Sequence, residues 1–402
     1  MSPPLAGVRV LDLGRIYQGP WAGLLMAMAG AEVVKVEPPG GEPARGRAGT
    51  DATVPFAMLN SNKSSITLDL KHRRGRQVLV DLASVADVLL ENFAPGVMDG
   101  LGLGPDLLLE ANPRLVYGSA TGFGVDGPDR DRLAMDITVQ AHAGVMSVTG
   151  FPEQPPVKAG VAFVDFLGGT HLYAGVVTAL YERERTGRGR VVDVAMVDAV
   201  YPTLASNLSS HYQFGTTPRT GNRHGGQSLA PYNAYPTSDG WVAIIVITED
   251  QWRRLTTAMG RPELGEDERY LSNGRRVHRM DEVEALVQEW TAGLTRAEVL
   301  SLCRDNRVPA SPVREVAEVV EDPHLHERGA IAHVNHPVLG DVVLPRSPIR
   351  YRGEALPDIR PSGALGADTD SVLRSWLGMD DAEVAQLRAD GVISSPGAGQ
   401  AT

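Results

Sequence analysis

The chain has 402 residues, with 38 lysines and arginines against 49 aspartates and glutamates, which gives a formal net charge of −11. Its length suggests two or three domains of roughly 100–200 residues, and its acidic balance argues against a nucleic-acid binder held by a general basic surface. A single cysteine, Cys303, excludes a disulfide framework and a cysteine-built metal site, and fits a reducing cytoplasm.

The apolar runs of the chain are too short to indicate a membrane span. The best of them, residues 21–31, is far below the roughly 20 residues needed to cross a bilayer. Residues 1–4 lack the basic and apolar regions of a signal peptide. We therefore expect a cytoplasmic protein with no membrane partner.

The first 125 residues alternate short apolar runs with helical patterns. The apolar runs predict strands at residues 8–13, 32–36, 65–70, 87–90 and 115–119. Between them we expect a helix over 20–29, opened by Pro20, and another over about 74–84. This rhythm indicates a doubly wound, mostly parallel α/β sheet. Ligands of such sheets bind beyond the carboxyl ends of the strands, here residues 14–18, Lys71 and 92–93.

The rest of the chain changes character several times. Its patterns predict a helix over 168–185, a strand over 191–194, a helix over 197–209, a hairpin over 235–247 around Asp239-Gly240, a small helical unit over 250–320, and a helical pair over 369–390. The polar, glycine-rich segment 221–227 is a linker or a binding loop, and the chain after Pro323 is expected to be irregular until 369. The best domain boundary lies near 215–230.

Several familiar motifs are absent. No Gly-x-Gly-x-x-Gly follows the first strand and there is no P-loop, so neither NAD nor ATP is expected. The segment 226–230 resembles a hydrolase nucleophile elbow, but it precedes a hairpin instead of joining a strand to a helix. Four histidines lack the zincin spacing and are interpreted as surface and turn residues, so no metal is expected. They are His324, His326, His333 and His336.

One carboxylate stands out, Asp165, at the predicted start of the long helix. As a structural residue it would cap that helix. As a functional residue it would be a nucleophile, desolvated by the apolar flanks 163–164 and 166–167 and kept ionised by the helix start. Gly168 and Gly169 would leave room for a bulky electrophile and expose N–H groups toward an acyl oxygen. The residues alone leave both interpretations open.

A series of short segments carries a resemblance over roughly residues 5–395. They are 31–38, 60–66, 91–96, Asp165 with its two glycines, 185–189 and 390–393. Each is weak alone, but in this order they resemble the family III CoA-transferases, the formyl-CoA and carnitine-CoA transferase group. That family shares its fold with the α-methylacyl-CoA racemases.

The resemblance implies covalent catalysis by Asp165 on an acyl-CoA donor and a carboxylic acid acceptor, through aspartyl anhydride and aspartyl–CoA thioester intermediates. Such chemistry conserves the thioester energy and needs neither ATP nor a metal. The implied CoA-binding residues are Tyr17, Gln18, Leu68, Lys71, Asn92 and Phe93, and the implied loop over the intermediate is Gly225, Gly226 and Gln227. Gly100 and Leu133 stand where some relatives carry cations, so the CoA phosphates need other partners, with Arg73, Arg74 and Arg132 as candidates.

The resemblance also implies a Rossmann-like, doubly wound large domain with a smaller α+β domain, in an interlocked homodimer. The large CoA-binding domain would comprise 1–215 and 335–402, with a linker at 216–224 and the small domain at 225–330. An acceptor pocket is expected from 135–150 and 225–233, including Tyr232 and Asn233. Arg223 either holds a second substrate carboxylate or is a surface residue.

Two alternatives remain at this point. The racemases use a His-Asp pair, which here reads Met135-Asp136, and a thioether cannot accept a proton near neutral pH. The nearest following histidine, His142, lies seven residues after Met135. A non-catalytic acyl-CoA-binding protein is the other alternative, against which the intact Asp165 and its glycines speak. The sequence therefore favours the transferase.

Overall fold

The computed structural model describes residues 2–46 and 52–394, which form two compact units. The first unit comprises the described parts of Met1–Val139, Val161–Val200 and Asp322–Thr402, and the second comprises Gln140–Gly160 and Tyr201–Glu321. In this division residues 140–160 and 201–215 lie in the second unit, whereas the expected large domain comprised 1–215. The Arg219 guanidinium ties the first of these segments to the second unit, since it donates to the carbonyls of Phe151, Pro152 and Gln154.

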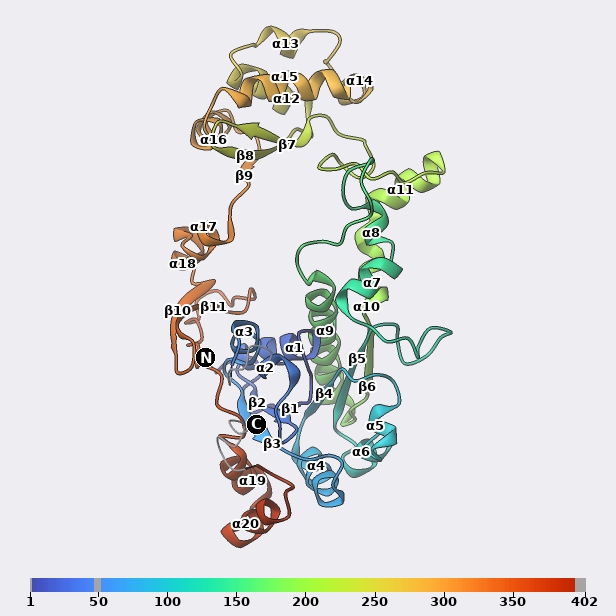
Figure 1. Ribbon diagram of the computed structural model, residues 1–402, viewed down its shortest axis with the longest axis vertical. Coiled ribbons are helices and arrows are strands. Elements are labelled where there is room, and N and C mark those ends of the chain that lie inside the picture. The colour runs from blue at the N-terminus through green and yellow to red at the C-terminus, as the bar shows by residue number, and fades with distance from the viewer. Residues whose placement is uncertain (1, 47–51, 395–402) are drawn as a thin grey trace. The chain divides into compact units, whose positions relative to one another are not determined.

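A six-stranded parallel sheet forms the centre of the first unit (Figure 1), which confirms the predicted α/β class. Its strands are β1 (Arg9–Asp12), β2 (Glu32–Glu37), β3 (Ser64–Thr67), β4 (Val88–Glu91), β5 (Val116–Thr121) and β6 (Val191–Ala195). They are ordered β3-β2-β1-β4-β5-β6, and every neighbouring pair is parallel. The strand order reverses between β1 and β4, which is where ligands of such sheets bind.

Two apolar layers cover the sheet because successive strand residues point to opposite faces. Val10 lies in a cluster with Met26 and Val176, whereas its neighbour Leu11 lies in a cluster with Leu82 and Leu373. The first layer contains α1 (Gln18–Met28) and α9 (Phe163–Thr186), and the second contains α4 (Arg73–Val85), α6 (Pro105–Ala111), α19 (Thr369–Leu377) and α20 (Asp381–Ala389). Shorter helices of this unit are α2 (Pro43–Gly46), α3 (Val54–Asn60), α5 (Val97–Gly100), α10 (Met196–Val200) and α18 (Pro323–Glu327).

Helix α9 is, by length and composition, apolar enough to cross a membrane. The sequence analysis had considered only the shorter apolar run at 21–31. In the fold it is a core helix, with half of its apolar window buried. Its last turns carry Arg183, whose guanidinium lies 2.7 Å from the Asp87 carboxylate. The buried side chains Leu172 and Val176 of this helix lie against Val10, Leu90 and Val116 of the sheet.

Two predicted segments differ from the structure. The helix predicted over 197–209 is divided into α10, a short 3-10 turn (Tyr201–Leu204) and α11 (Ala205–Phe214), because Pro202 has no N–H to continue the ladder. The segment after Pro323 is not irregular, since β10 (Ile331–His336) and β11 (Gly340–Pro345) form an antiparallel hairpin. Its turn needs Gly340 at φ 73°, a conformation that glycine adopts without strain.

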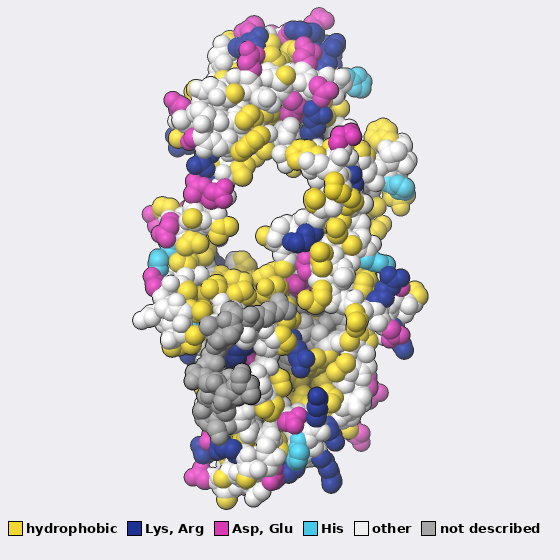
Figure 2. All heavy atoms as spheres, viewed as in Figure 1, with side chains coloured by type: hydrophobic (Ala, Val, Ile, Leu, Met, Phe, Trp, Pro, Cys, Tyr) yellow, Lys and Arg dark blue, Asp and Glu magenta, His cyan; other side chains and the backbone are white. Residues whose placement is uncertain are grey.

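The second unit combines a small antiparallel sheet with helices. The strands are β7 (Tyr232–Thr237), β8 (Gly240–Ile245) and β9 (Ala310–Pro312), in that order. The helices are α8 (Val145–Val148), α11, α12 (Glu249–Ala258), α13 (Glu263–Glu266), α14 (Asn273–His278), α15 (Met280–Ala292), α16 (Arg296–Asp305) and α17 (Val316–Val320), while α7 (Asp136–His142) runs from the first unit into this one. Charges of both signs intersperse over the outer helices of this unit (Figure 2).

Candidate active site

Asp165 lies in the first turn of α9, but it does not cap the helix. The N-cap residue is Ala162, which makes no side-chain capping hydrogen bond. The capping acceptor is Asp136, whose Oδ2 accepts from the N–H groups of Val164 at 2.9 Å and Asp165 at 3.3 Å. Asp136, from another segment, therefore fills the capping role that was considered for Asp165. The Asp165 carboxylate is not needed to cap the helix.

The electrostatic surroundings of Asp165 differ from those expected at a helix start. The residue is 7% exposed, and within the described residues 2–46 and 52–394 its carboxylate makes no hydrogen bond or ion pair. Burial, and then the charge of Asp136, raise the pKa of Asp165 to about 7. The sequence predicted that the helix start keeps this acid ionised, whereas desolvation and a like charge act in the opposite direction.

The two glycines after Asp165 serve a different purpose from the one expected. A Cβ on Gly168 would lie 2.6 Å from Nε2 of Gln18, and one on Gly169 would lie 2.4 Å from the Gln18 carbonyl oxygen. The space beside them is therefore filled by α1, and it is not left open for an electrophile. Their own N–H groups lie past the first turn, where the helix ladder takes them up. The glycines bring Gln18 onto the helix face that carries Asp165.

The N-cap residue and the first turn of α1 pack against the first turn of α9. The rings of Tyr17 and Phe166 lie 6.1 Å apart and nearly parallel, and Trp21 packs edge-on against Phe166 at 5.2 Å. Gln18 is 1% exposed, and its Nε2 has no hydrogen-bond partner in the described part of the chain. Tyr17 thus stacks on the residue after Asp165, and Gln18 brings a buried donor to Gly168, one turn further along α9.

Buried charged side chains hold the backbone of residues 14–18 in place. The Glu42 carboxylate accepts from the N–H of Ile16 at 3.1 Å, and the Asp12 carboxylate accepts from the N–H of Gly14 at 2.8 Å. The Lys35 ammonium donates to the Gly14 carbonyl. These contacts stabilise Ile16 at φ 64°, a conformation that a β-branched residue rarely adopts. This arrangement could not be predicted, since Glu42 lies 26 residues along the chain from Ile16, whose N–H it accepts.

A cavity of about 450 Å³ lies at the carboxyl ends of the central strands. Three of the predicted CoA-binding residues, Leu68, Lys71 and Phe93, line it together with Gly100 and Arg15. Arg15 was not among the predicted residues, although it lies within the segment 14–18 that the fold rule had marked. The cavity shares this segment with the surroundings of Asp165.

Asn92 has a different role from the other predicted binding residues. Its Oδ1 accepts from the N–H of Arg15 at 2.7 Å, and its Nδ2 donates to the carbonyl of Arg15 at 3.0 Å. Both ends of the side-chain amide are therefore used to fix the backbone of Arg15. Asn92 positions a residue of the cavity, and it is not among the residues that line it.

Among the arginines proposed as phosphate partners, two already have carboxylate partners. Arg74 pairs with Asp390, and Nε of Arg132 lies 2.7 Å from Oδ1 of Asp129. Arg73 is exposed at the start of α4. Leu133 is 85% exposed.

The loop Gly225, Gly226 and Gln227 lies in the second unit and is organised by a histidine. The ring nitrogens of His224 lie 3.2 Å from the Ser206 hydroxyl and 3.0 Å from the Ser228 hydroxyl. Beside the loop, Nη2 of Arg223 lies 2.6 Å from Oδ1 of Asp281. The Arg223 guanidinium thus already has a carboxylate partner, which favours its interpretation as a surface residue.

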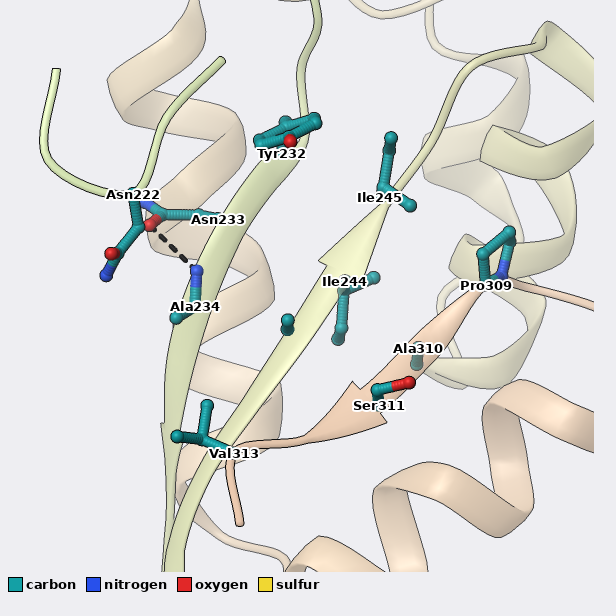
Figure 3. Close-up of a pocket in the computed structure, with 11 residues that line it drawn as sticks. Asn222, Tyr232, Asn233, Ala234, Ile244, Ile245, Pro309, Ala310, Ser311 and Val313 are labelled. Atoms are coloured by element: carbon teal, nitrogen blue, oxygen red, sulfur yellow. Dashed lines mark hydrogen bonds between the residues drawn. The ribbon is translucent and has the colours of Figure 1, made fainter. Parts of the chain in front are cut away.

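The second unit has its own cavity, of about 480 Å³, on one face of its small sheet (Figure 3). Tyr232 and Asn233, predicted for the acceptor pocket, line it with Ile245 and Ser311. The lining is largely apolar, since Ile244, Ile245 and Val313 contribute to it, and the Asn233 carboxamide oxygen accepts from the N–H of Ala234 at 2.8 Å.

Comparison with known proteins identifies the class of protein that this fold and site define. The sequence model of a family described as CoA-transferase family III matches residues 5–369. The chain belongs to this family, as the motifs at 31–38, 60–66 and 91–96 had indicated, and it is a CoA-transferase.

Individual relatives cover nearly the whole chain. It is 36% identical to a formyl-CoA:oxalate CoA-transferase of Streptomyces avermitilis, over 98% of this chain and 100% of that protein. It is 35% identical to the β subunit of a succinyl-CoA–L-malate CoA-transferase of Chloroflexus aurantiacus, over 97% of this chain and 98% of that protein. A crystal structure of a CaiB/BaiF family protein from Brucella suis superimposes with a TM-score of 0.82 at 34% identity, covering 94% of this chain and all of that one.

Proposed function

We propose that this CoA-transferase moves CoA from an acyl-CoA thioester to a free carboxylic acid through covalent intermediates on Asp165. The observation that carries the proposal is a buried carboxylate, 7% exposed, with no cationic partner among the described residues and a pKa raised to about 7. A carboxylate stripped of water and of counter-charge is a stronger nucleophile than one in solution.

The reaction balances without any other reagent. An oxygen of Asp165 attacks the thioester carbonyl carbon, the C–S bond breaks, and CoA leaves as the thiolate from a mixed anhydride. The thiolate then attacks the Asp165 carbonyl carbon and releases the donor acid, which leaves an aspartyl–CoA thioester. The acceptor carboxylate displaces CoA to form a second anhydride, and the thiolate attacks the acceptor carbonyl carbon to give the new thioester and free Asp165.

The residues around Asp165 fit the demands of these steps. Each addition places negative charge on a carbonyl oxygen, and the buried Nε2 of Gln18 offers a hydrogen-bond donor on the same helix face. The aromatic rings of Tyr17, Trp21 and Phe166 form an apolar wall, which would limit the access of water to the anhydrides.

The acceptor is proposed to be a small carboxylic acid, and dicarboxylic acids come first among the candidates. The named relatives act on oxalate and on L-malate, which are both dicarboxylic. The pairing of Arg223 with Asp281 gives no support to Arg223 as the residue that holds a second carboxylate. A panel of acyl-CoA donors against mono- and dicarboxylic acids would identify the pair.

The test of the proposed mechanism is the exchange of CoA between a thioester and a free acid, followed by chromatography. Asp165→Ala should fold and bind CoA but lose exchange by at least about 10⁴-fold, since no other group can form the anhydride. Asp193→Ala is the matched control, because burial also raises the pKa of that carboxyl in the same unit. Substantial exchange by Asp165→Ala would show that the assignment is wrong.

We also propose that the active form is a homodimer, as in the interlocked arrangement that the family resemblance implies. Size-exclusion chromatography with light scattering should give about twice the mass of the 43.0 kDa chain. A monomer at micromolar concentration with full activity would contradict the proposal.

A further inference from the structure

A histidine of the second unit fastens the glycine-rich loop 225–227 to a neighbouring helix. The Nε2 atom of His224 lies 3.2 Å from the Ser206 hydroxyl, and its Nδ1 atom lies 3.0 Å from the Ser228 hydroxyl. Ser206 belongs to α11, and Ser228 follows the loop directly. Because a neutral imidazole donates from one nitrogen and accepts at the other, a single ring satisfies both serines. One side chain thus joins the loop to α11.

The two glycines let the loop lie close against the same helix. A Cβ on Gly225 would lie 3.1 Å from Nδ2 of Asn207, and a Cβ on Gly226 would lie 3.2 Å from the carbonyl oxygen of Ser206. Both distances are shorter than ordinary van der Waals contacts, so a larger residue at either position would push the loop away from α11. The glycines therefore serve a close fit, and not a freely moving loop.

The turn after the glycines is strained. Gln227 has φ 48°, a left-handed conformation that a residue with a side chain keeps only where its surroundings impose it. The Gln227 N–H donates to the His224 carbonyl at 2.7 Å, and the His224 ring packs edge-on against the ring of Tyr232 at 5.4 Å. The backbone and the ring of His224 therefore both hold this turn in one geometry.

The ends of the segment are held by other residues. Before the loop, the Thr220 hydroxyl donates to the Arg223 carbonyl at 2.9 Å. After it, the side-chain amide of Asn273 donates to the Ser228 carbonyl at 2.7 Å. Neither contact involves the imidazole. Loss of the His224 ring would therefore loosen the middle of the segment and leave its ends attached.

We propose that His224 is a positioning residue for catalysis, which holds the loop 225–227 in the geometry that shields the covalent intermediates on Asp165 from water. The inference rests on the proposed function, which supplies these intermediates, and on the family resemblance, which implies this loop over them. An aspartyl–CoA thioester reacts with water as well as with a carboxylate. Water that attacks its carbonyl carbon breaks the C–S bond and gives free CoA and free Asp165, so the thioester energy is lost.

The test measures transfer and hydrolysis in one reaction mixture, transfer as the new acyl-CoA and hydrolysis as the free thiol of CoA. His224→Ala removes both hydrogen bonds of the ring, which should raise the ratio of hydrolysis to transfer about 10- to 100-fold. Ser228→Ala keeps the ring and removes one hydrogen bond, so it should raise the ratio about 2- to 10-fold. A residue that served stability alone would lower both rates together and leave their ratio unchanged.

The control is His211→Ala, which removes an exposed histidine from the last turn of the same helix and should leave both rates unchanged. The double variant Asp165→Ala/His224→Ala should neither transfer CoA nor release thiol, because the hydrolysis runs through Asp165.

The inference is overturned if His224→Ala and Ser228→Ala keep the wild-type ratio, if His211→Ala raises it equally, or if the double variant still releases thiol. Substantial transfer by Asp165→Ala alone would instead remove the proposed function. The two failures are therefore distinguishable.

Discussion

Two buried carboxylates of the first unit, Asp12 and Asp165, have opposite electrostatic surroundings. Burial alone would raise the pKa of Asp12, but Lys63 and Lys35 lower it below its usual value. The Lys63 ammonium lies 2.7 Å from the Asp12 carboxylate, and it also donates to the carbonyl of Pro20 and to Asn60. Asp165 has a like charge, Asp136, as its neighbour, and its pKa rises to about 7.

The difference distinguishes a carboxylate that stabilises the fold, Asp12, from one that is available for catalysis, Asp165. A buried carboxylate with a cation beside it is neutralised, and it serves to hold the segment 14–18 in place. A buried carboxylate with another acid as its neighbour costs stability, and such a cost is typical of functional sites. The following predictions test this distinction, from the largest expected effect to the smallest.

The Asp12 region should respond mainly in stability. Lys63→Met removes the cation closest to the buried Asp12 charge and leaves only Lys35 to oppose it, which should cost about 3–5 kcal/mol of the free energy of unfolding. Denaturant titration of the variant would measure it, with Lys158→Met, at an exposed position of the second unit, as the control. A loss below about 1 kcal/mol would show that the pair is not structural.

The Asp165 region should respond with the opposite sign. Because its folded pKa lies above the unfolded one, wild-type stability falls as the pH rises from about 4 to about 7. Asp165→Asn removes this penalty, so the variant should be more stable at pH 8 by up to roughly 4 kcal/mol, and equal to the wild type near pH 4. Urea titrations at both pH values would measure the difference. A variant less stable than the wild type at pH 8 would contradict the assignment of a raised pKa.

The pH profile of exchange should depend on Asp136. Only ionised Asp165 is a nucleophile, so kcat/KM should rise through a midpoint near pH 7. Asp136→Asn keeps an oxygen to cap α9 but removes the charge, so the midpoint should move down by about one pH unit. Asp131→Asn, at an exposed position, is the control. A midpoint that stays in place or rises would exclude Asp136 as the cause.

Local patterns predicted the sheet well. The expected strands at 32–36, 87–90 and 115–119 differ from β2, β4 and β5 by at most two residues at either end, since each is a short apolar run between turn signals. The rule that ligands bind at the carboxyl ends of strands marked residues 14–18, Lys71 and 92–93, and of these Arg15, Lys71 and Phe93 line one cavity. The hairpin at 331–345 was missed because only Val334 marks the buried side of its first strand clearly: His333 and Asn335 are exposed, and the next buried position is taken by the polar His336.

The parts of the site that depend on tertiary contacts could not be predicted. The cap of α9 comes from Asp136, which lies in a separate segment, so the sequence alone left Asp165 open to both the capping role and the nucleophile role. The glycines at 168–169 were read as open space because the approach of Gln18 is invisible in the chain. Arg15 was not predicted as a cavity residue because its position depends on contacts with Asn92 and Phe93, which are distant in sequence.

The most direct test of the central claim is to trap the covalent intermediate. The enzyme is mixed with an acyl-CoA, hydroxylamine is added, and the peptides are analysed by mass spectrometry. Hydroxylamine attacks an aspartyl anhydride or thioester, so the account predicts a hydroxamate on Asp165, which is lost in Asp165→Ala. Full exchange activity with an unmodified Asp165, or with the hydroxamate on another residue, would contradict it.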